Sequence, residues 1–422
     1  MGKTFLKVFT TVMLIFCVGC GREKEGTEDS QEAETINSSN EIRVLTSKDM
    51  TTQSTHCSTS NGCYLASTSP EHGGKNIFFI DYKTRQKVYL SSSVNGDYWS
   101  ETDTSYLKDG ASTTFCSDGD KLYAYALMDS EEIKEEIIYQ MDFDGQNRKE
   151  ICRMADNTEL VGGMMSDDTY LYFLMQEYEE NGSESVICAV NKNGGEIKKL
   201  YKFADEAHVC YLMSAFDRKL VLKMVEPNEV YEKQQHKVFL FDVDTADVTE
   251  VMSWEQDKIE ELYDGNNVYY LDVEKEKIVC KDLSDGSEEV LWETFPFSYN
   301  SGDSLSIDSE LHDKHLFIYT YDKQYALNVE TKEIKELTLR AEGDLFRGSY
   351  LSIMGASEDE YLLIPDTGRR KVHWKDHIEG SNGDEVIYYY KYAMIKKEDF
   401  YNNRPNYIMI EDMEIDKDSI VS

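Results

Sequence analysis

The sequence predicts an all-β fold, a seven-bladed β-propeller, from three observations. A short acidic turn followed by an apolar run recurs along the chain, and a second turn recurs later in most repeats. The apolar runs are short and rich in Tyr, Val, Ile, Leu and Phe, without the sustained 3.6-residue spacing of a helix. A unit of this kind cannot hide its own apolar faces, and stacking the units in a ring covers them.

The acidic turns set the period of the repeat. Their aspartates stand at Asp118, Asp167, Asp217, Asp264, Asp313 and Asp359. Successive gaps are therefore 49, 50, 47, 49 and 46 residues, and a weaker first copy, Glu71-His72-Gly73-Gly74, precedes the apolar residues 77–80. Seven units of about 48 residues, with about four strands each, match the size of a propeller blade. The same spacing leaves six or eight blades as alternatives.

The second turn joins one alternating run to the next. It occurs as Asp142-Phe143-Asp144-Gly145, Asn191-Lys192-Asn193-Gly194, Asp242-Val243-Asp244-Thr245, Asp282-Leu283-Ser284-Asp285-Gly286 and Asn328-Val329-Glu330-Thr331. Gly and Asn tolerate positive φ and Asp accepts hydrogen bonds from nearby backbone amides, so these are predicted hairpin turns. Both tight turns of a repeat should lie on one face of the disc. Residues 41–45 and 406–410 are the candidates for a strand that closes the ring.

The start of the chain has the form of an export signal. Lys3 and Lys7 precede a short apolar stretch, which is too short to span a bilayer. The stretch ends in Phe16-Cys17-Val18-Gly19-Cys20, which resembles the lipobox of bacterial lipoproteins. The resemblance implies that residues 1–19 are a signal peptide and that Cys20 carries the lipid. Cys17 stands where the family usually has Leu.

The remaining domain boundaries follow from composition. Residues 20–40 are polar and acidic, as in a flexible linker, residues 41–411 hold the repeats, and residues 412–422 form an acidic C-terminal tail. The chain has 44 basic and 81 acidic side chains and a net charge of −37. This charge repels nucleic acid and anionic lipid, which leaves the acyl chain as the expected membrane contact. The sequence does not decide whether Cys57 and Cys63 form a disulfide. Neither a cofactor nor a metal site is predicted.

A resemblance to a known family covers most of the predicted propeller. The run Ile138-Tyr139-Gln140-Met141-Asp142-Phe143-Asp144-Gly145-Gln146-Asn147 resembles the repeat of low-density-lipoprotein-receptor-like propeller domains of unknown function. Such domains occur in surface lipoproteins of Gram-positive bacteria. The resemblance implies an extracytoplasmic, lipid-anchored binding or scaffold protein, and it supplies no catalytic residues.

Two long connections are the candidate binding loops, residues 91–112 and 365–385, because loops on a rigid scaffold usually carry function. The second is a basic and aromatic segment in an acidic chain. The functional hypothesis is that an anionic or carbohydrate ligand, or a partner protein, contacts Trp99, Arg369, Arg370, His373 and Trp374. The alternative, which is the more common outcome for such segments, is a solvated insertion whose charges pair with neighbouring acids.

Two functional hypotheses follow. The first is a non-enzymatic, ligand-binding or protein-scaffolding propeller on the cell surface, whose partner is an envelope protein or a carbohydrate. The second is an extracytoplasmic hydrolase or lyase that acts on glycan or peptide, with paired carboxylates at the mouth of the channel. The sequence contains none of the GxSxG, GxxxxGK[ST] or GxGxxG motifs, which disfavours the enzyme classes that use them.

Overall fold

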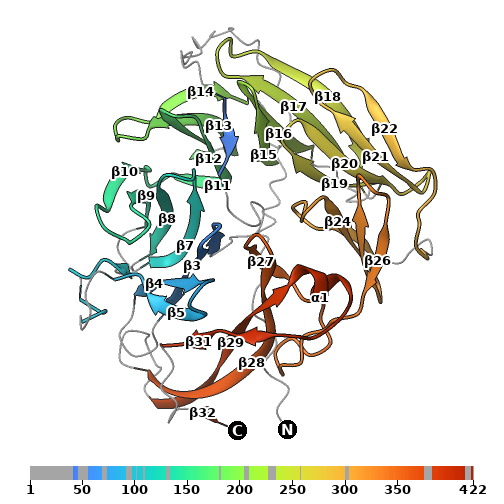
Figure 1. Ribbon diagram of the computed structural model, residues 1–422. Helices are drawn as coiled ribbons and strands as arrows, with labels where there is room; N and C mark the ends of the chain where they lie inside the picture. Colours follow the sequence, from blue (N-terminus) through green and yellow to red (C-terminus); the bar gives the residue numbers. More distant parts are fainter. Residues whose placement is uncertain are drawn as a thin grey trace, which may run out of the picture. The chain divides into compact units, whose positions relative to one another are not determined.

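The chain folds into seven small antiparallel sheets arranged in a ring (Figure 1). The computed structural model describes residues 41–45, 56–68, 74–91, 97–100, 102–107, 110–129, 134–179, 182–203, 209–226, 234–256, 258–299, 304–374, 383–413 and 420–421. All of these residues belong to one of the chain's two compact units, Ala33–Ser422. The predicted signal peptide and linker, including Cys20, lie outside the described residues.

Each of the first four blades consists of four consecutive strands. Blade 1 contains β2 (His56–Ser58), β3 (Gly62–Thr68), β4 (Lys75–Asp81) and β5 (Gln86–Tyr89). Blade 2 contains β7 (Gly110–Ser117), β8 (Leu122–Asp129), β9 (Lys134–Met141) and β10 (Lys149–Arg153). Blade 3 contains β11 (Thr158–Ser166), β12 (Tyr170–Glu179), β13 (Gly182–Asn191) and β14 (Lys198–Lys202). Blade 4 contains β15 (Val209–Phe216), β16 (Lys219–Glu226), β17 (Gln235–Asp242) and β18 (Val248–Glu255).

The last three blades follow the same order, and a few short elements are added to the ring. Blade 5 contains β19 (Ile259–Asp264), β20 (Asn267–Asp272), β21 (Lys277–Asp282) and β22 (Glu288–Trp292). Blade 6 contains β23 (Leu305–Ile307), β24 (His315–Thr320), β25 (Gln324–Asn328) and β26 (Ile334–Leu337). Blade 7 contains β27 (Ile353–Ala356), β28 (Glu360–Trp374), β29 (Gly383–Lys396) and β30 (Ile408–Met409). The added elements are β1 (Arg43–Val44), β6 (Tyr106–Leu107), α1 (Lys397–Tyr401), β31 (Glu411–Asp412) and β32 (Ile420–Val421).

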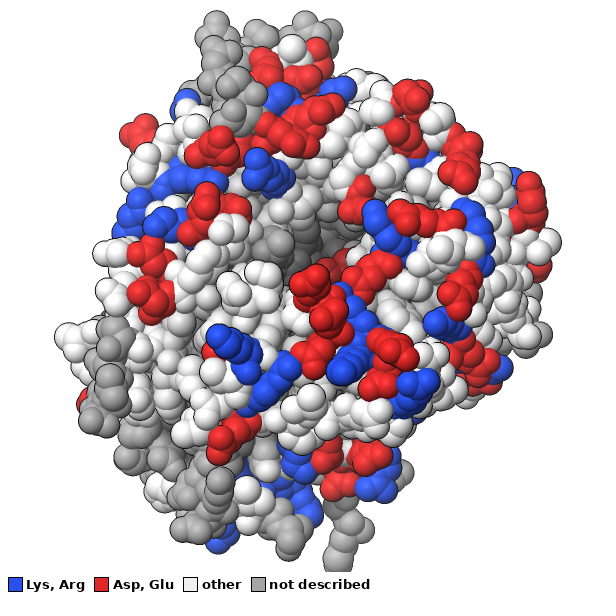
Figure 2. Space-filling model, in the orientation of Figure 1, with Lys and Arg blue, Asp and Glu red and all other residues white. Residues whose placement is uncertain are grey.

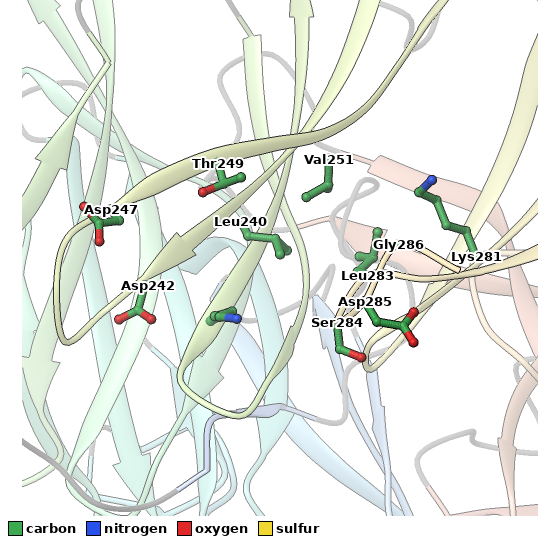
Figure 3. A pocket seen from close by; sticks show the side chains of 11 residues that line it. Leu240, Asp242, Asp247, Thr249, Val251, Lys281, Leu283, Ser284, Asp285 and Gly286 are labelled. Carbon is green, nitrogen blue, oxygen red and sulfur yellow. The ribbon is translucent and has the colours of Figure 1, made fainter. Parts of the chain in front are cut away.

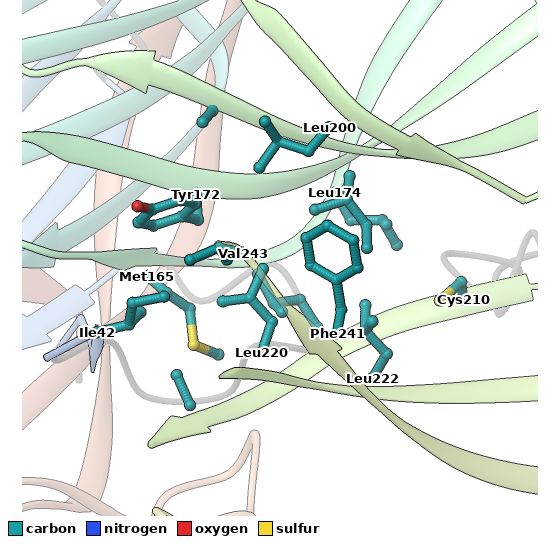
Figure 4. Close-up of a cluster of buried hydrophobic side chains, with 14 of the residues drawn as sticks. Ile42, Met165, Tyr172, Leu174, Leu200, Cys210, Leu220, Leu222, Phe241 and Val243 are labelled. Atoms are coloured by element: carbon teal, nitrogen blue, oxygen red, sulfur yellow. The ribbon is translucent and has the colours of Figure 1, made fainter. Parts of the chain in front are cut away.

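The hydrophobic core is divided among the contacts between blades. Seven clusters of buried side chains occur, and each joins two neighbouring blades, the last of them blades 7 and 1. Figure 4 shows the cluster between blades 3 and 4, in which Tyr172 and Leu174 face Leu220, Leu222 and Phe241. We call each of these contacts a seam. One cluster per seam is the packing that closes a ring of sheets.

The continuous apolar runs arise because a blade is buried on both faces. Successive side chains of a strand point to opposite faces. In β12, Leu171 and Phe173 pack toward blade 2, whereas Tyr172 and Leu174 pack toward blade 4. All four side chains are nearly inaccessible. An apolar run without alternation therefore indicates a strand between two neighbours.

The predicted turns are confirmed with one exception. The acidic turns from Asp118 to Asp359 join first to second strands, and the second set joins third to fourth strands. The ion pair between Lys121 and Asp142 connects the two kinds of turn in blade 2. We call the side of the ring that carries both kinds of turn the turn face. The exception is the weak first copy, because Gly74 precedes β4, the third strand of blade 1.

The prediction for ring closure is wrong in its detail. β1 pairs with β11 and so adds an inner strand to blade 3, not to blade 7. The segment 406–410 contributes β30 to its own blade 7. The crossing is made by the next residues, since β31 pairs in parallel with β5 of blade 1. Lys87 of β5, whose side chain is 6% exposed, forms an ion pair of 3.1 Å with Asp412.

The seven described cysteines are free thiols. Cys57 pairs with Tyr64 across β2 and β3, whereas Cys63 pairs with Ser58, so the two thiols point to opposite faces of blade 1. They belong to different clusters, those facing blades 2 and 7. The disulfide that the sequence left open is therefore absent between these two residues.

Candidate functional site

The basic segment singled out in the sequence is a strand rather than a loop. Arg369, Arg370, His373 and Trp374 lie on β28, which pairs with β29 over almost its whole length. β28 has 15 residues, whereas its inner neighbour β27 has four. The hairpin therefore extends beyond its own blade, and we call the part from Asp366 to Trp374, with the paired part of β29, the arm. The loop prediction failed because β28 is rich in charged residues, which are uncommon in strands. The strand-forming signal lies in its partner, residues 386–392.

One face of the arm displays aromatic and basic side chains. Directly paired residues of antiparallel strands share a face. Three such pairs are Arg369 with Tyr388, Lys371 with Val386, and Thr367 with Tyr390. Val386, Tyr388 and Tyr390 are 45%, 46% and 42% exposed. Phe346, itself 37% exposed, stacks on Tyr390 with ring centroids 5.8 Å apart. We call this set the aromatic face of the arm.

The arm separates two arginines that the sequence analysis treated together. Arg370 lies opposite Ile387 and therefore points to the face away from Arg369. Gly368 lies on the same side as Arg370, where a Cβ would come within 2.2 Å of the Tyr389 ring, so the ring covers the glycine backbone. At the base of the arm, Lys391 forms an ion pair of 2.6 Å with Asp366. His373 is exposed and pairs across the strands with residue 384.

Trp99, the remaining predicted site residue, lies on blade 1. Its ring makes edge contacts with Tyr89 and Tyr106 at centroid distances of 6.3 and 6.2 Å. Tyr98 stacks on Tyr89, with ring centroids 4.2 Å apart. Trp99 is half-buried by this packing. Blade 1 is the ring neighbour of blade 7, so the predicted residues lie on adjacent blades.

The acidic turns hold blades together across the seams, a role that the sequence analysis missed. Asp118 accepts hydrogen bonds from the Tyr123 hydroxyl at 2.8 Å and from the Lys192 ammonium of blade 3 at 2.6 Å. Burial alone would raise the pKa of the Asp118 carboxyl. The hydrogen bonds from Lys192, the backbone amides and Tyr123 outweigh burial and lower the pKa below its ordinary value of 3.8.

Asp167 repeats this arrangement at the next seam. Its carboxylate accepts hydrogen bonds from the Tyr172 hydroxyl at 2.7 Å and from Arg218 of blade 4 at 2.9 Å. The Asp167 side chain is 0% exposed and that of Arg218 15%. Burial again opposes ionisation, but the hydrogen bonds lower the pKa of Asp167. An aspartate five residues before a tyrosine was the available sequence signal, because both turns share it.

We call an ion pair that joins two blades at an acidic turn a latch, and the other latches use different residues. At the seam between blades 6 and 7, Asp313 pairs with Lys397 at 2.9 Å and accepts a hydrogen bond from Tyr361. At the seam between blades 7 and 1, Glu360 pairs with Arg85. These contacts lie at the ends of the first-to-second strand turns, as at Asp118 and Asp167. Four of the seven seams therefore carry an ion pair at an acidic turn.

One pocket lies at the seam between blades 4 and 5. It has a volume of about 460 Å³ and separates the outer strands of blade 4 from the last turn of blade 5. Figure 3 shows Leu240, Asp242 and Thr249 on one side and Leu283 and Asp285 on the other. Asp242 is engaged in its own turn, where it accepts the Asp244 and Thr245 amides. The lining therefore mixes structural carboxylates with a few apolar side chains.

A smaller pocket, of about 230 Å³, lies between blades 2 and 3 beside Arg43 of β1. Its lining includes the Asp118–Lys192 pair, so its charges are largely structural. Glu261, whose pKa burial raises despite Lys223, lines neither pocket and forms an ion pair across the seam between blades 4 and 5. In the described part of the chain, no three His, Cys, Asp or Glu side chains converge as metal ligands.

The surface around the pockets mixes both signs of charge. Figure 2 shows acidic and basic side chains side by side around a central hollow. This distribution agrees with the many exposed ion pairs, each of which contributes little to stability. Among the described residues, no helix has the length and hydropathy that a membrane crossing requires.

Comparison with known proteins supports the fold alone. No family model and no curated protein matches the sequence. A prolyl endopeptidase structure is 11% identical with a TM-score of 0.50, covering 84% of this chain and 55% of that one. The β-propeller domain of the Trilobed protease from Pyrococcus furiosus is 10% identical, with a TM-score of 0.47 over 89% of this chain and all of that one. TolB from Acinetobacter baumannii is 11% identical, with a TM-score of 0.31 over 70% and 62%. The chain spans about half of the endopeptidase. Its own seven sheets, arranged in a ring (Figure 1), make it a seven-bladed β-propeller.

Proposed function

We propose that this chain is a non-enzymatic, lipid-anchored binding propeller outside the bacterial cell, and that it docks a partner protein on the aromatic face of the arm. The observation that carries the proposal is the exposed row of Val386, Tyr388 and Tyr390, extended by the stacked ring of Phe346. Exposed rings in one row are costly to leave in water, and a partner surface covers them. Scattered single exposed rings would carry no such meaning.

The residue types on this face favour a protein partner. Tyr and Arg are enriched among the residues that dominate protein–protein binding energy. Tyr388 lies directly opposite Arg369, and Lys371 flanks the row. Two paired strands fix these side chains, so binding orders few of them and loses little conformational entropy. A partner with apolar residues inside an acidic rim matches the face.

The start of the described chain and the arm lie at different faces of the ring. The Ile42 amide donates a hydrogen bond of 2.8 Å to the Asp217 carbonyl, which lies in a turn on the turn face. β1 then runs antiparallel to β11, away from that face. The described part of the chain therefore begins at the turn face. The arm runs the opposite way, since β28 begins at Glu360 beside the turn face and ends at Trp374. The first described residues and the end of the arm therefore lie on opposite faces of the ring.

The partner test uses the full lipid-anchored chain in cells. A photo-crosslinking amino acid in place of Tyr388 should give an adduct with one protein, and the same group in place of Tyr321 should not. Tyr321 is 81% exposed and lies on blade 6, outside the arm. Tyr388→Ala with Tyr390→Ala should abolish co-purification of that protein, whereas Tyr321→Ala with Tyr178→Ala should preserve it. Equal recovery by both pairs of variants would refute the proposal.

The anchor has its own test. Cys20→Ser should move the protein from the membrane fraction to the soluble extracytoplasmic fraction, because the thiol that carries the lipid is gone. Cys17→Ser is the matched control and should leave the protein in the membrane fraction. Retention of the Cys20→Ser protein in the membrane would exclude the lipid tether.

A further inference from the structure

The C-terminal strand shows that the edge of β28 accepts an extended chain. β32 pairs antiparallel with β28, through Ile420 with Arg370 and Val421 with Arg369. It uses the same edge as β27, which pairs with residues 361–363 six positions earlier. β29 occupies the other edge. The arm therefore holds a segment from the chain's own end at the position of an additional strand.

The resident segment is weakly held. Only two residue pairs join β32 to β28. Ile420 remains 47% exposed, so docking removes about half of its surface from water. Full burial of such a side chain is worth about 1.5–3 kcal/mol, and half burial gives correspondingly less. Met413, the last described residue before β32, is 57% exposed. A segment with more pairs and a better covered apolar side chain would bind the same edge more tightly.

Charge complementarity identifies the chemistry that the edge accepts. The arm concentrates Arg369, Arg370 and Lys371 in a chain whose net charge is −37. Residues 414–422 contain three acidic residues and one lysine, followed by the apolar Ile420 and Val421. The segment seen on the edge is therefore the end of an acidic peptide with β-branched residues, which favour extended backbone.

We propose that the edge of β28 at Arg369 and Arg370 is a strand-addition site for an extended acidic segment of a partner protein, and that residues 420–421 occupy it when the partner is absent. Main-chain hydrogen bonds would supply the affinity, and the arginines would select acidic segments. The inference rests on the proposed function, because it names the chemistry of the partner that the arm binds. The aromatic face and the edge are adjacent surfaces of one hairpin.

The attached segment competes with any other peptide for the edge of β28. A segment joined by a short linker acts at an effective concentration in the millimolar range. A free peptide of equal intrinsic affinity must compete against that concentration, so removal of the segment should raise its apparent affinity. A partner overcomes the competition by adding contacts, for example on the aromatic face.

The experiment measures binding of a fluorescent peptide with the sequence of residues 414–422. It compares the full chain with the same chain ending at Met413, which keeps β31 and its contact with blade 1. The shortened chain should bind the peptide. The full chain should bind it with an affinity lower by about tenfold or by a larger factor. A peptide with proline in place of Ile420 should not bind, because proline removes a main-chain donor and resists strand pairing.

Matched variants separate charge from folding. Arg369→Gln with Arg370→Gln in the shortened chain should weaken binding, whereas Arg153→Gln with Arg404→Gln, two exposed arginines away from the arm, should not. Unchanged circular dichroism and urea midpoint establish that the variants fold. Equal binding to full and shortened chains, or no binding to either, would overturn the proposal. Tail-dependent dimers of the full chain would overturn it in favour of a second copy. Because no envelope partner is present, these results are independent of the crosslinking test.

Discussion

The seam between blades 3 and 4 and the arm of blade 7 use the same residue types in opposite ways. At the seam, Tyr172 and Arg218 converge on the Asp167 carboxylate, whose side chain is 0% exposed. On the arm, Tyr388 lies opposite Arg369 and is 46% exposed. The seam joins two blades, whereas the aromatic face of the arm extends past its blade.

The difference shows that burial of a shared acceptor decides which role a Tyr and Arg pair takes. A buried carboxylate loses its hydration and must be compensated by donors, so the donors around Asp167 are fixed by the fold. Where the donors face solvent, their removal costs the fold little. Four predictions test this contrast, from the largest expected effect on stability to the smallest.

Asp167→Ala should produce the largest loss of stability. The substitution leaves the Tyr172 hydroxyl without its acceptor and leaves Arg218 paired with Asp244 alone, and the loss of such buried hydrogen bonds should cost about 2 kcal/mol. The free energy of unfolding from urea titration measures the loss. Asp156→Ala, at an exposed aspartate, is the control and should change it by less than about 0.5 kcal/mol. Equal effects of the two substitutions would show that the seam is not held by this carboxylate.

Acid should weaken the latched seams. Asp118 and Asp167 have folded-state pKa values below their ordinary value of 3.8, so each contributes stability above that value. The contribution is lost as the pH falls through the lowered folded-state values. The urea midpoint of the native chain should therefore fall below about pH 4, and Asp118→Asn with Asp167→Asn should fall less steeply. Parallel pH profiles of the two proteins would contradict this assignment.

Tyrosines of the two regions should respond differently. Tyr172→Phe removes a buried hydroxyl that donates to Asp167 and should cost about 1 kcal/mol in the free energy of unfolding. Tyr388→Ala removes a whole exposed ring and should nevertheless cost less than about 0.5 kcal/mol. A larger loss from Tyr388→Ala would mean that the arm is part of the structural core.

Thiol labelling should distinguish the two regions without perturbing stability. Burial raises the pKa of Cys152, Cys188 and Cys210 to about 12, so these thiols stay protonated and unreactive in the folded protein. In a chain with Cys17→Ser, Cys20→Ser and Cys280→Ser, the last because Cys280 is only half-buried, a thiol reagent should react slowly until urea is added. Tyr388→Cys should add one thiol that reacts at once in the folded state. Rapid reaction of the native thiols would indicate that the seams open.

Much of the ring could be predicted because its signals are local. Aspartates spaced 46–50 residues apart marked six of the seven first turns, and apolar runs on both sides of them marked the buried strands. Asp242, Asp282 and Asn328 cap their own turns as expected, each accepting the amide two residues ahead. Blade 1 was misplaced because its first turn uses Thr59 and Asn61 and has no aspartate.

The candidate site was located in part. The arm was found by composition, as a basic segment in an acidic chain, but its strand structure depended on pairing with β29, a contact that the segment's own residues do not encode. The opposite orientation of Arg369 and Arg370 follows from that pairing. The latches at Asp118 and Asp167 join residues 74 and 51 positions apart, so no local pattern contained them.

The placement of β1 has a mechanical consequence. Ile42 packs into the seam between blades 3 and 4, and Leu45 packs into the seam between blades 2 and 3. These two residues, at the innermost edge of one sheet, therefore contact three blades. A pull on the preceding chain would load two packed interfaces in shear at the centre of the ring. The outermost strands, which would peel apart one hydrogen bond at a time, would carry none of the first load.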